Sequence, residues 1–504
     1  MTNVVSALGA SLHNILTRLK AQPTLYPNLD IAYSSSEPVI EPVVLTLPTN
    51  GIRLRFDGPD QRLRLVEVLD FTKTSFSYKG TDLVRHFKTA GDVSKEQEAP
   101  QSGPSFRHVY NRLFGPSYPG EYIPPGPKDK SGLGTYVLSY PGIAFSFPVQ
   151  DSKWSPDADF VALLSSSAAL PAKSMAIFHG SSWSDARSEL YTQQPQFPRA
   201  ISLNGRSKEV VADEIEQVLI KGNGKLEVIR RNSPIFVIRL SETTPQDLVA
   251  ELGPPDAIYR KYDDKIAIHG EQRGADLTTL NGRLQSTSHN SNTGLQQDFL
   301  DSPDPSEVGG ERDTNQHTVP VECFYNYFHH GFDALVSQPA DKSPAFPAGE
   351  EDKNHQPSMT TSQMVVTKIL LHGNVPGSYP FNRHRRSRWV IDLATGEDDG
   401  LTSEMPFPEI SAALVDTWRE TYANREQERS LQRGMVLNRG WGESPDSSLE
   451  LLGGWEESGG TTGRMGPDPL MDGVQGLGNT ELFGFPGLLF EVLKNGTVSC
   501  LTVY

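Results

Sequence analysis

The residues best suited to chemistry are two groups of arginines that stand far apart in the chain. They are Arg53, Arg55, Arg62 and Arg64 in the first group, and Arg383, Arg385, Arg386 and Arg388, followed by Trp389, in the second. Guanidinium groups pair with carboxylates and phosphates through parallel hydrogen bonds. Both groups are therefore candidate anion contacts. The second, a basic run beside an aromatic residue, has the composition of a phosphoinositide headgroup site at a membrane surface.

A plainer interpretation stays open for each group. Arginines that face one another across strands repel, so something anionic should lie opposite the first group. We favour nearby acids such as Asp57, Asp60 and Glu67, or an acidic neighbouring unit, over a bound phosphate or an acidic partner. The second group also has the composition of a solvated loop that follows a strand.

Other chemical motifs are absent from the sequence. It contains no Walker A loop, G-x-S-x-G elbow, H-E-x-x-H helix or C-x-x-C pair, so we predict no catalytic residue and no cofactor. His329 and His330 could begin a metal site with His269 and His372. No carboxylate or cysteine sits at ligand spacing, however, and we predict structural histidines and no metal.

The elements that must position these residues are glycine-led hairpins. In residues 51–68, Ile52, Leu54 and Phe56 alternate with Arg53 and Arg55, and a turn of Asp, Gly and Pro separates them from a second alternating run. The pattern returns three times. The later copies are residues 140–147 with 174–180, residues 328–335 with 367–373, and residues 485–492 with 497–503.

Helix signals precede these hairpins. Residues 11–19, 105–113 and 244–252 carry apolar side chains three and four apart, and residues 408–432 also read as helical. The repetition predicts an α+β fold of tandem units, each a helix followed by an antiparallel meander. Parallel sheets are not expected, because long helices do not alternate with strands.

The predicted division of the chain follows these units. The boundaries are 1–80 for unit 1, 104–190 for unit 2, 200–240 for three bridging strands, 241–392 for unit 3, and 393–504 for a partial unit 4. Unit 3 includes two polar insertions, 271–319 and 338–362, and unit 4 includes a glycine-rich loop, 442–479. These stretches hold too few apolar residues to offset chain entropy, so we predict that they are disordered.

Bulk properties exclude several classes of protein. The net charge of -16 repels nucleic acid and anionic membrane at long range, so any anion site must be local. Two cysteines cannot build a disulfide framework, which indicates a reducing compartment. No apolar run is long enough to span a bilayer. The sequence therefore predicts a cytoplasmic protein without a transmembrane segment or a nucleic-acid partner.

Several stretches resemble the phagosome assembly factor family. They are GIRLRFDGPDQRLRLVEVLDFTKTSFSYKG from Gly51, CFYNYFHHGFDALV from Cys323, KILLHGNVPGSYPFN from Lys368, and FPGLLFEVLKNGTVSCLTVY at the end of the sequence. The long polar insertions look fungal. The resemblance implies a non-enzymatic autophagy adaptor that pairs with a β-propeller protein and is recruited to phosphoinositide-marked membrane at the phagophore assembly site. A phosphoinositide-binding module that acts by itself is the alternative.

Overall fold

The computed structural model describes ten stretches of the chain. They are residues 8–84, 102–127, 131–193, 213–260, 322–338, 363–393, 400–419, 424–426, 434–438 and 479–504. The insertions predicted at 271–319, 338–362 and 442–479 fall outside the described residues, apart from single residues at their ends.

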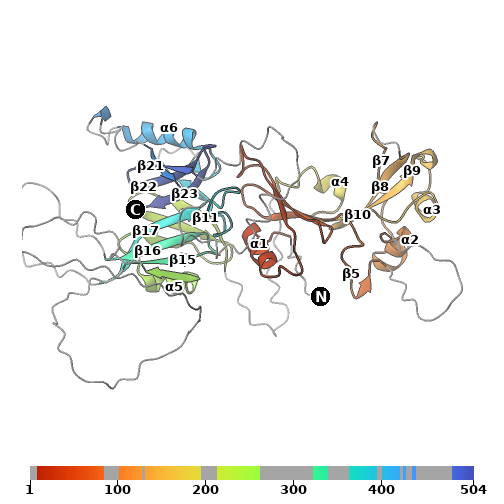
Figure 1. The fold of residues 1–504 in the computed structure, drawn as a ribbon, viewed down its shortest axis with the longest axis horizontal. Coiled ribbons are helices and arrows are strands. Elements are labelled where there is room, and N and C mark those ends of the chain that lie inside the picture. Colours follow the sequence, from red (N-terminus) through yellow and green to blue (C-terminus); the bar gives the residue numbers. More distant parts are fainter. Residues whose placement is uncertain are drawn as a thin grey trace, which may run out of the picture.

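Two eight-stranded antiparallel sheets dominate the molecule, and they lie in its two halves (Figure 1). The first sheet has the spatial order β1 (Asp30–Ala32), β2 (Val43–Leu47), β3 (Ile52–Phe56), β4 (Leu63–Val68), β10 (Ser174–Phe178), β9 (Ile143–Gln150), β8 (Leu133–Tyr140) and β7 (Glu121–Ile123). The C-terminal sheet has the order β14 (Ala257–Arg260), β15 (Cys323–Tyr327), β16 (Phe332–Ser337), β17 (Val365–His372), β23 (Val498–Val503), β22 (Leu488–Leu493), β21 (Asn479–Phe485) and β20 (Met435–Asn438).

Each large sheet consists of two four-stranded meanders joined through their last strands. β4 pairs with β10 in the first sheet, and β17 pairs with β23 in the second. A helix precedes each meander in the chain. The helices are α1 (Leu12–Lys20), α2 (Phe106–His108) continuing into the π-helix η1 (Val109–Leu113), α5 (Pro245–Leu252) and α6 (Phe407–Trp418). The predicted α+β class with helix-plus-meander units is confirmed.

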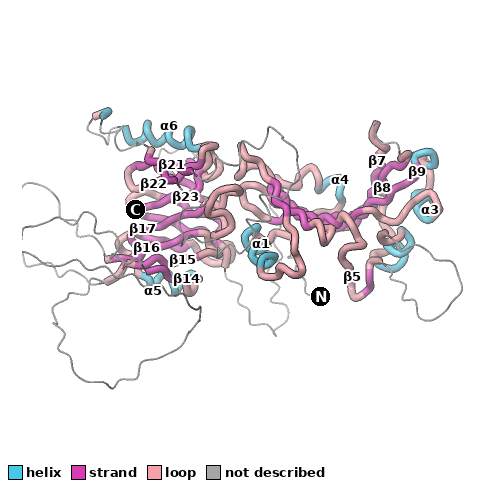
Figure 2. The backbone as a smooth tube through the Cα atoms, in the orientation of Figure 1, coloured by secondary structure: helices cyan, strands magenta, loops and turns pink. Residues whose placement is uncertain are grey.

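The remaining short elements decorate this framework. They are the two-stranded ribbon β5 (Ser77–Tyr78) and β6 (Thr81–Asp82), the 3-10 helix η2 (Asp151–Lys153), α3 (Phe160–Ser165) and α4 (Trp183–Ala186). In Figure 2 the strands of the C-terminal half form a stack, whereas the first sheet extends away from it as a long twisted ribbon.

A five-stranded sheet packs against the C-terminal sheet. Its order is β13 (Phe236–Arg239), β12 (Lys225–Arg230), β11 (Ile215–Ile220), β18 (Trp389–Ile391) and β19 (Leu401–Thr402). One core contains apolar side chains from both sheets and from α5 and α6. The pairing of β11 with β18 is parallel, which corrects the expectation of antiparallel pairing throughout. These strands are far apart in sequence, so no tight turn between them dictates an antiparallel arrangement.

Helix caps and apolar stripes explain where the helices form. The Ser11 side chain accepts a hydrogen bond from the backbone N–H of Asn14 at the start of α1, and Thr244 forms a capping box with Asp247 at the start of α5. The buried face of α1 consists of Leu12, Ile15, Leu16 and Leu19, which pack on β2, β3 and β4.

A glycine with positive φ leads each of the four hairpins. The glycines are Gly51, Gly142, Gly331 and Gly487, with φ between 67° and 86°. Gly331 is also crowded, because a Cβ atom placed there would lie 2.5 Å from the backbone oxygen of Arg385. Only glycine meets both constraints without strain.

Replacing Gly331 by alanine should destabilise the fold more than the same change at Gly115. Gly115 has a similar φ of 88°, but nothing lies within 4 Å of its added Cβ. We expect about 1 kcal/mol of destabilisation at Gly115, from backbone strain alone, and roughly 2 kcal/mol more at Gly331. Chemical denaturation of the two variants measures this difference. Equal losses of unfolding free energy would contradict the role of the close contact.

Candidate functional site

The two arginine groups meet where the first hairpin contacts the C-terminal half. The first group lies in and on either side of the turn between β3 and β4, residues 57–62, and the second lies in the loop between β17 and β18, residues 373–388. The Gln61 amide donates to the backbone carbonyl of Asn374, and the Asn374 amide donates to the side-chain oxygen of Gln61, both at 2.8 Å. Both side chains are buried, so loss of either partner would leave a polar group without a hydrogen bond.

Arg386 lies at the centre of this junction, with 1% of its side chain exposed. Its Nε donates to the backbone carbonyl of Pro59 at 2.7 Å, and its Nη1 donates to that of Gly373 at 2.8 Å. Its Nη2 lies 3.3 Å from Oε1 of Glu404. Burial lowers the pKa of Arg386, and the Glu404 carboxylate opposes that shift. One guanidinium therefore ties the first hairpin turn to the loop and to residues after β19.

Arg388 reinforces the same junction from its partly exposed rim. Its Nη1 donates to Oδ1 of Asp60 at 2.7 Å, and its Nε donates to Oε1 of Glu404 at 2.9 Å. Burial alone would raise the pKa of Glu404, but Arg386 and Arg388 outweigh burial and lower it. Glu404 is therefore an ionised counter-charge shared by two arginines.

Glu214 provides a second shared carboxylate, just before β11. It lies 2.8 Å from Nη1 of Arg62, 2.8 Å from Nη1 of Arg231 and 3.6 Å from Nη2 of Arg385, each measured to Oε2. Burial lowers the pKa of Arg62, and the Glu214 carboxylate opposes that shift without reversing it. The five-stranded sheet is thus linked electrostatically to both arginine groups.

Charged side chains of the first hairpin also form ion pairs with one another. Nε of Arg55 donates to Oε2 of Glu67 at 2.7 Å, and Nη1 of Arg53 lies 3.8 Å from the same oxygen. Arg64 is buried and forms an ion pair with Asp57. Burial raises the pKa of Asp57, although the charge of Arg64 opposes that shift. The predicted pairing with nearby acids is therefore confirmed for these three arginines.

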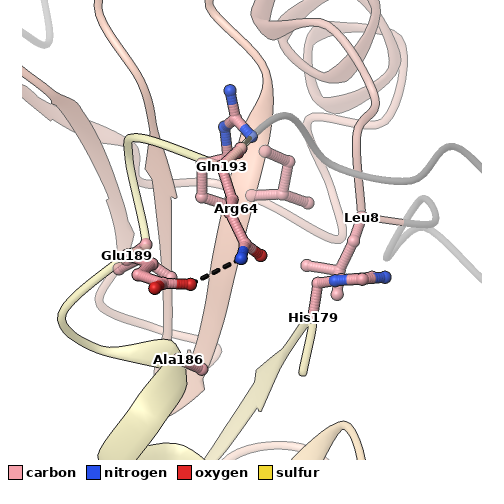
Figure 3. Close-up of a pocket in the computed structure, with 8 residues that line it drawn as sticks. Leu8, Arg64, His179, Ala186, Glu189 and Gln193 are labelled. Carbon is pink, nitrogen blue, oxygen red and sulfur yellow. Dashed lines mark hydrogen bonds between the residues drawn. The ribbon is translucent and has the colours of Figure 1, made fainter. Parts of the chain in front are cut away.

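A small pocket adjoins Arg64 on the first sheet (Figure 3). It is lined by Leu8, Leu63, Arg64, His179, Ala186, Glu189, Leu190 and Gln193. Nη1 of Arg64 donates to the backbone carbonyl of Gln193, and the Gln193 amide donates to Glu189. Several of the polar groups that line this pocket are therefore already paired within the chain.

Most of the second basic run is enclosed by the protein. Arg385, Arg386 and Trp389 are buried, and Trp389 lies in the core with its ring edge toward Phe490. The solvated loop considered from the sequence is wrong for these three residues, because residues 373–388 fill the space between the halves. Arg383 is exposed. Contact with an anion or a phosphoinositide stays a prediction for both arginine groups.

Sequence reasoning missed most partners of these arginines. Gln61, Glu214, Asn374 and Glu404 were not singled out, and Asp60 was noted only as a neighbour of the first group. The bonds that join Gln61 to Asn374 and Arg388 to Asp60 span 313 and 328 residues. No local periodicity predicts such contacts. The one available signal was the number of arginines on neighbouring strands of the first hairpin. Arginines that face one another require acidic partners somewhere in the fold.

A partly buried acid and two histidines form a second polar cluster beside the junction. Oδ2 of Asp333 accepts a hydrogen bond from Nε2 of His372 at 2.9 Å, and Oδ1 accepts one from Nε2 of His384 at 2.8 Å. His329 and His330 do not join this cluster; His329 lies beside His13 and Asp256 instead. His269 is outside the described residues. The sequence argument therefore overlooked Asp333 and His384.

The charge state of this cluster follows from its contacts. Burial favours a neutral Asp333, but the two imidazoles outweigh it and hold the pKa of the carboxyl well below its usual range. Burial lowers the pKa of His384 to about 4, against the effect of Asp333. Burial also lowers that of His372, but Cys500 and Asp333 more than compensate and raise it to about 10. An ionised Asp333 therefore lies between a protonated His372 and a neutral His384.

The ring geometry of the cluster favours hydrogen bonding over metal binding. Ligand atoms of Asp333, His372 and His384 lie within 4.8 Å of one another, which is close enough to consider a metal ion. The two imidazoles, however, stack at 3.7 Å between centroids with 13° between their planes. An imidazole binds a metal through a lone pair in its ring plane, and lone pairs in stacked parallel planes do not converge on one point. In this arrangement the carboxylate bridges the two rings.

The fold and the junction define an α+β protein of helix-plus-meander units whose halves are joined by buried charges. No helix among the described residues is long and apolar enough to cross a membrane. A family model described as phagosome assembly factor 1 (PHAF1) matches residues 4–284 and 358–504. The chain belongs to this family.

Matches to relatives from three organisms cover most of the chain. A PHAF1 protein of Arabidopsis thaliana is 24% identical over 510 residues, which cover 99% of this chain and 90% of the relative. A Caenorhabditis elegans PHAF1 protein is 22% identical, covering 81% of this chain and 79% of the relative. A Drosophila melanogaster PHAF1 protein is 21% identical, covering 99% and 90%. No solved structure matches the chain.

Replacing Arg386 by glutamine should destabilise the protein by about 3–5 kcal/mol. The change leaves Glu404 with less compensating charge and removes donors from the carbonyls of Pro59 and Gly373. Urea denaturation measures the loss. The matched control is Arg383→Gln, because Arg383 is exposed in the same loop and its replacement should cost less than about 0.5 kcal/mol. Similar losses for the two variants would contradict the central position of Arg386.

Proposed function

We propose that this protein is a non-enzymatic adaptor in phagosome or autophagosome assembly. Family membership carries this proposal, because the family is described as an assembly factor and its model matches residues 4–284 and 358–504. An assembly factor brings other molecules together, and this role requires binding surfaces rather than a catalytic centre.

The charged groups of the described residues support this proposal. Arg386 and Arg388 each pair with Glu404 and with the first hairpin turn, and the Asp333 carboxylate is occupied by two imidazoles. These groups stabilise the relative position of the two halves. A scaffold built in this way presents its outer surfaces at a fixed spacing, which favours simultaneous contact with a large partner.

Exposed apolar residues on an edge strand also favour a protein-binding role. Ile258 is 54% exposed and Tyr259 is 64% exposed on β14, which pairs only with β15 among the described strands. Exposed apolar side chains on a sheet edge are a common feature of protein-binding surfaces. The family resemblance implies a β-propeller protein as the partner, with recruitment from the cytoplasm to the phagophore assembly site.

The alternative is a phosphoinositide-binding module that acts by itself. It has less support, because Arg385, Arg386 and Trp389 are buried and cannot reach a membrane surface without rearrangement. Arg383 is the exposed member of that basic run, and it is the residue through which a headgroup contact is best tested.

Affinity purification tests the adaptor directly. The tagged full chain is isolated from its own cells, fed and starved, and the eluate is separated by gel filtration and identified by mass spectrometry. We expect a stoichiometric complex with a β-propeller protein. Elution as a lone chain under both conditions would contradict the adaptor function.

Vesicle binding separates the alternative from the adaptor. The purified chain is mixed with phosphoinositide vesicles at low and high salt, together with Arg383→Ser and a control, Arg239→Ser, which replaces an exposed arginine on β13. The adaptor account predicts that the chain alone binds weakly and that both variants behave like the native protein. Tight, salt-sensitive binding that Arg383→Ser abolishes would favour the lipid module instead.

A further inference from the structure

A proline-rich segment surrounds the edge strand β7, at the end of the first sheet that points away from the C-terminal half (Figure 1). Two short runs in this segment have prolines three residues apart. They are Pro-Ser-Tyr-Pro at residues 116–119, before β7, and Pro-Pro-Gly-Pro at residues 124–127, after it. Proline fixes φ near the value of the polyproline II helix, which has three residues per turn. Prolines at this spacing therefore fall on one side of such a helix.

Tyr118 lies within the first of these runs and projects into solvent. It is 90% exposed, which is the largest exposed fraction among the large apolar and aromatic residues that the structure describes. Pro116 and Pro119 on either side of it are exposed as well. A tyrosine ring provides a large contact area with few rotatable bonds, and tyrosine is enriched among the residues that dominate protein interfaces. The run at residues 116–119 therefore presents an aromatic ring between two prolines.

Three hydrogen bonds to residues of β8 hold the chain on both sides of Tyr118. The Tyr140 hydroxyl donates to the carbonyl oxygen of Gly115 at 2.9 Å, the Ser117 hydroxyl donates to that of Ser139 at 2.7 Å, and the Gly120 N–H donates to the Tyr136 hydroxyl at 2.6 Å. The backbone groups of residues 116–119, in contrast, form no hydrogen bond to another described residue. The loop is thus fixed at its ends, while its own carbonyl oxygens stay free to accept.

Protection of the edge strand explains the prolines but not the tyrosine. β7 is the outermost strand of the first sheet, and prolines beside such a strand hinder its pairing with another chain. This role requires no aromatic ring. The next tyrosine, Tyr122 inside β7, is used within the fold, because its ring stacks on Trp154 at 4.3 Å between centroids and its hydroxyl donates to Asp151. Tyr118 is the tyrosine of this segment whose ring is left to solvent.

We propose that residues 116–119 are a docking segment for a protein domain whose aromatic-lined groove binds extended, proline-rich chains. Pro116 and Pro119 pack between the aromatic rings of such a groove, Tyr118 adds a further contact, and the free carbonyl oxygens accept hydrogen bonds from the groove. Binding requires little ordering of the loop, because its ends are already fixed. This partner is a second one, beyond the partner that the adaptor proposal expects, and it binds far from the junction between the halves.

Binding of the full chain to a panel of purified SH3 and WW domains tests this proposal. The domains are immobilised, and the native protein is compared with Tyr118→Ala and Pro119→Ala. The matched control is Tyr259→Ala, because Tyr259 is 64% exposed but has no proline next to it. We expect at least one domain to bind, and each of the two loop variants to bind it about tenfold more weakly or worse. The control should bind like the native protein, and an excess of oligoproline peptide should displace it.

Three results would overturn the proposal. They are a panel in which no domain binds, native-like binding by Tyr118→Ala, and an equal loss of binding in Tyr259→Ala. Thermal unfolding checks that each variant is folded, and Tyr118→Ala should melt like the native protein because its ring lies in solvent. If Pro119→Ala lowers the melting temperature, Pro116→Ala takes its place. Failure here leaves the adaptor proposal intact, since affinity purification reports complexes formed through any surface.

Discussion

The burial of one positive charge between two distant chain segments is the constraint on which this structure depends. Arg386 is enclosed with 1% of its side chain exposed, and it bonds to backbone carbonyls on both sides of the junction. An enclosed guanidinium without partners is very costly. The turn before β4, the loop before β18 and the carboxylate of Glu404 must therefore stay together, and this requirement sets how the two large sheets are placed.

The other polar features are arranged around that requirement. Gln61 and Asn374 form hydrogen bonds with each other where the two segments touch. Asp333 accepts hydrogen bonds from the stacked rings of His372, at the end of β17, and His384, in the same loop. The large apolar cores lie on either side of the junction, around α1 in the first half and between two sheets in the second. Apolar burial thus stabilises each half and, through the small cluster of Val39, Val375 and Leu493, also contributes to the junction, whereas buried charges and amides specify how the halves meet.

Local patterns explain how much the sequence could predict. Alternation around Gly51 and its three counterparts predicted the four hairpins, since period-two burial and a left-handed glycine are local properties. Apolar side chains three and four apart predicted α1 and α5 for the same reason. The parallel pairing of β11 with β18 and the burial of Trp389 depend on contacts between segments far apart in the chain. No local pattern encodes those contacts, so an arginine run that reads as surface became the centre of an interface.

Hydrogen–deuterium exchange of the native protein tests the central claim most directly. The loop, residues 373–388, has no regular secondary structure, yet the N–H groups of Asn382, Arg385 and Ser387 bond to partners at 2.7–2.8 Å. If the junction is closed, peptides from this loop and from the turn, residues 57–62, will exchange as slowly as the strands that flank them. Exchange at the rate of an exposed loop, with the flanking strands still protected, would contradict the account.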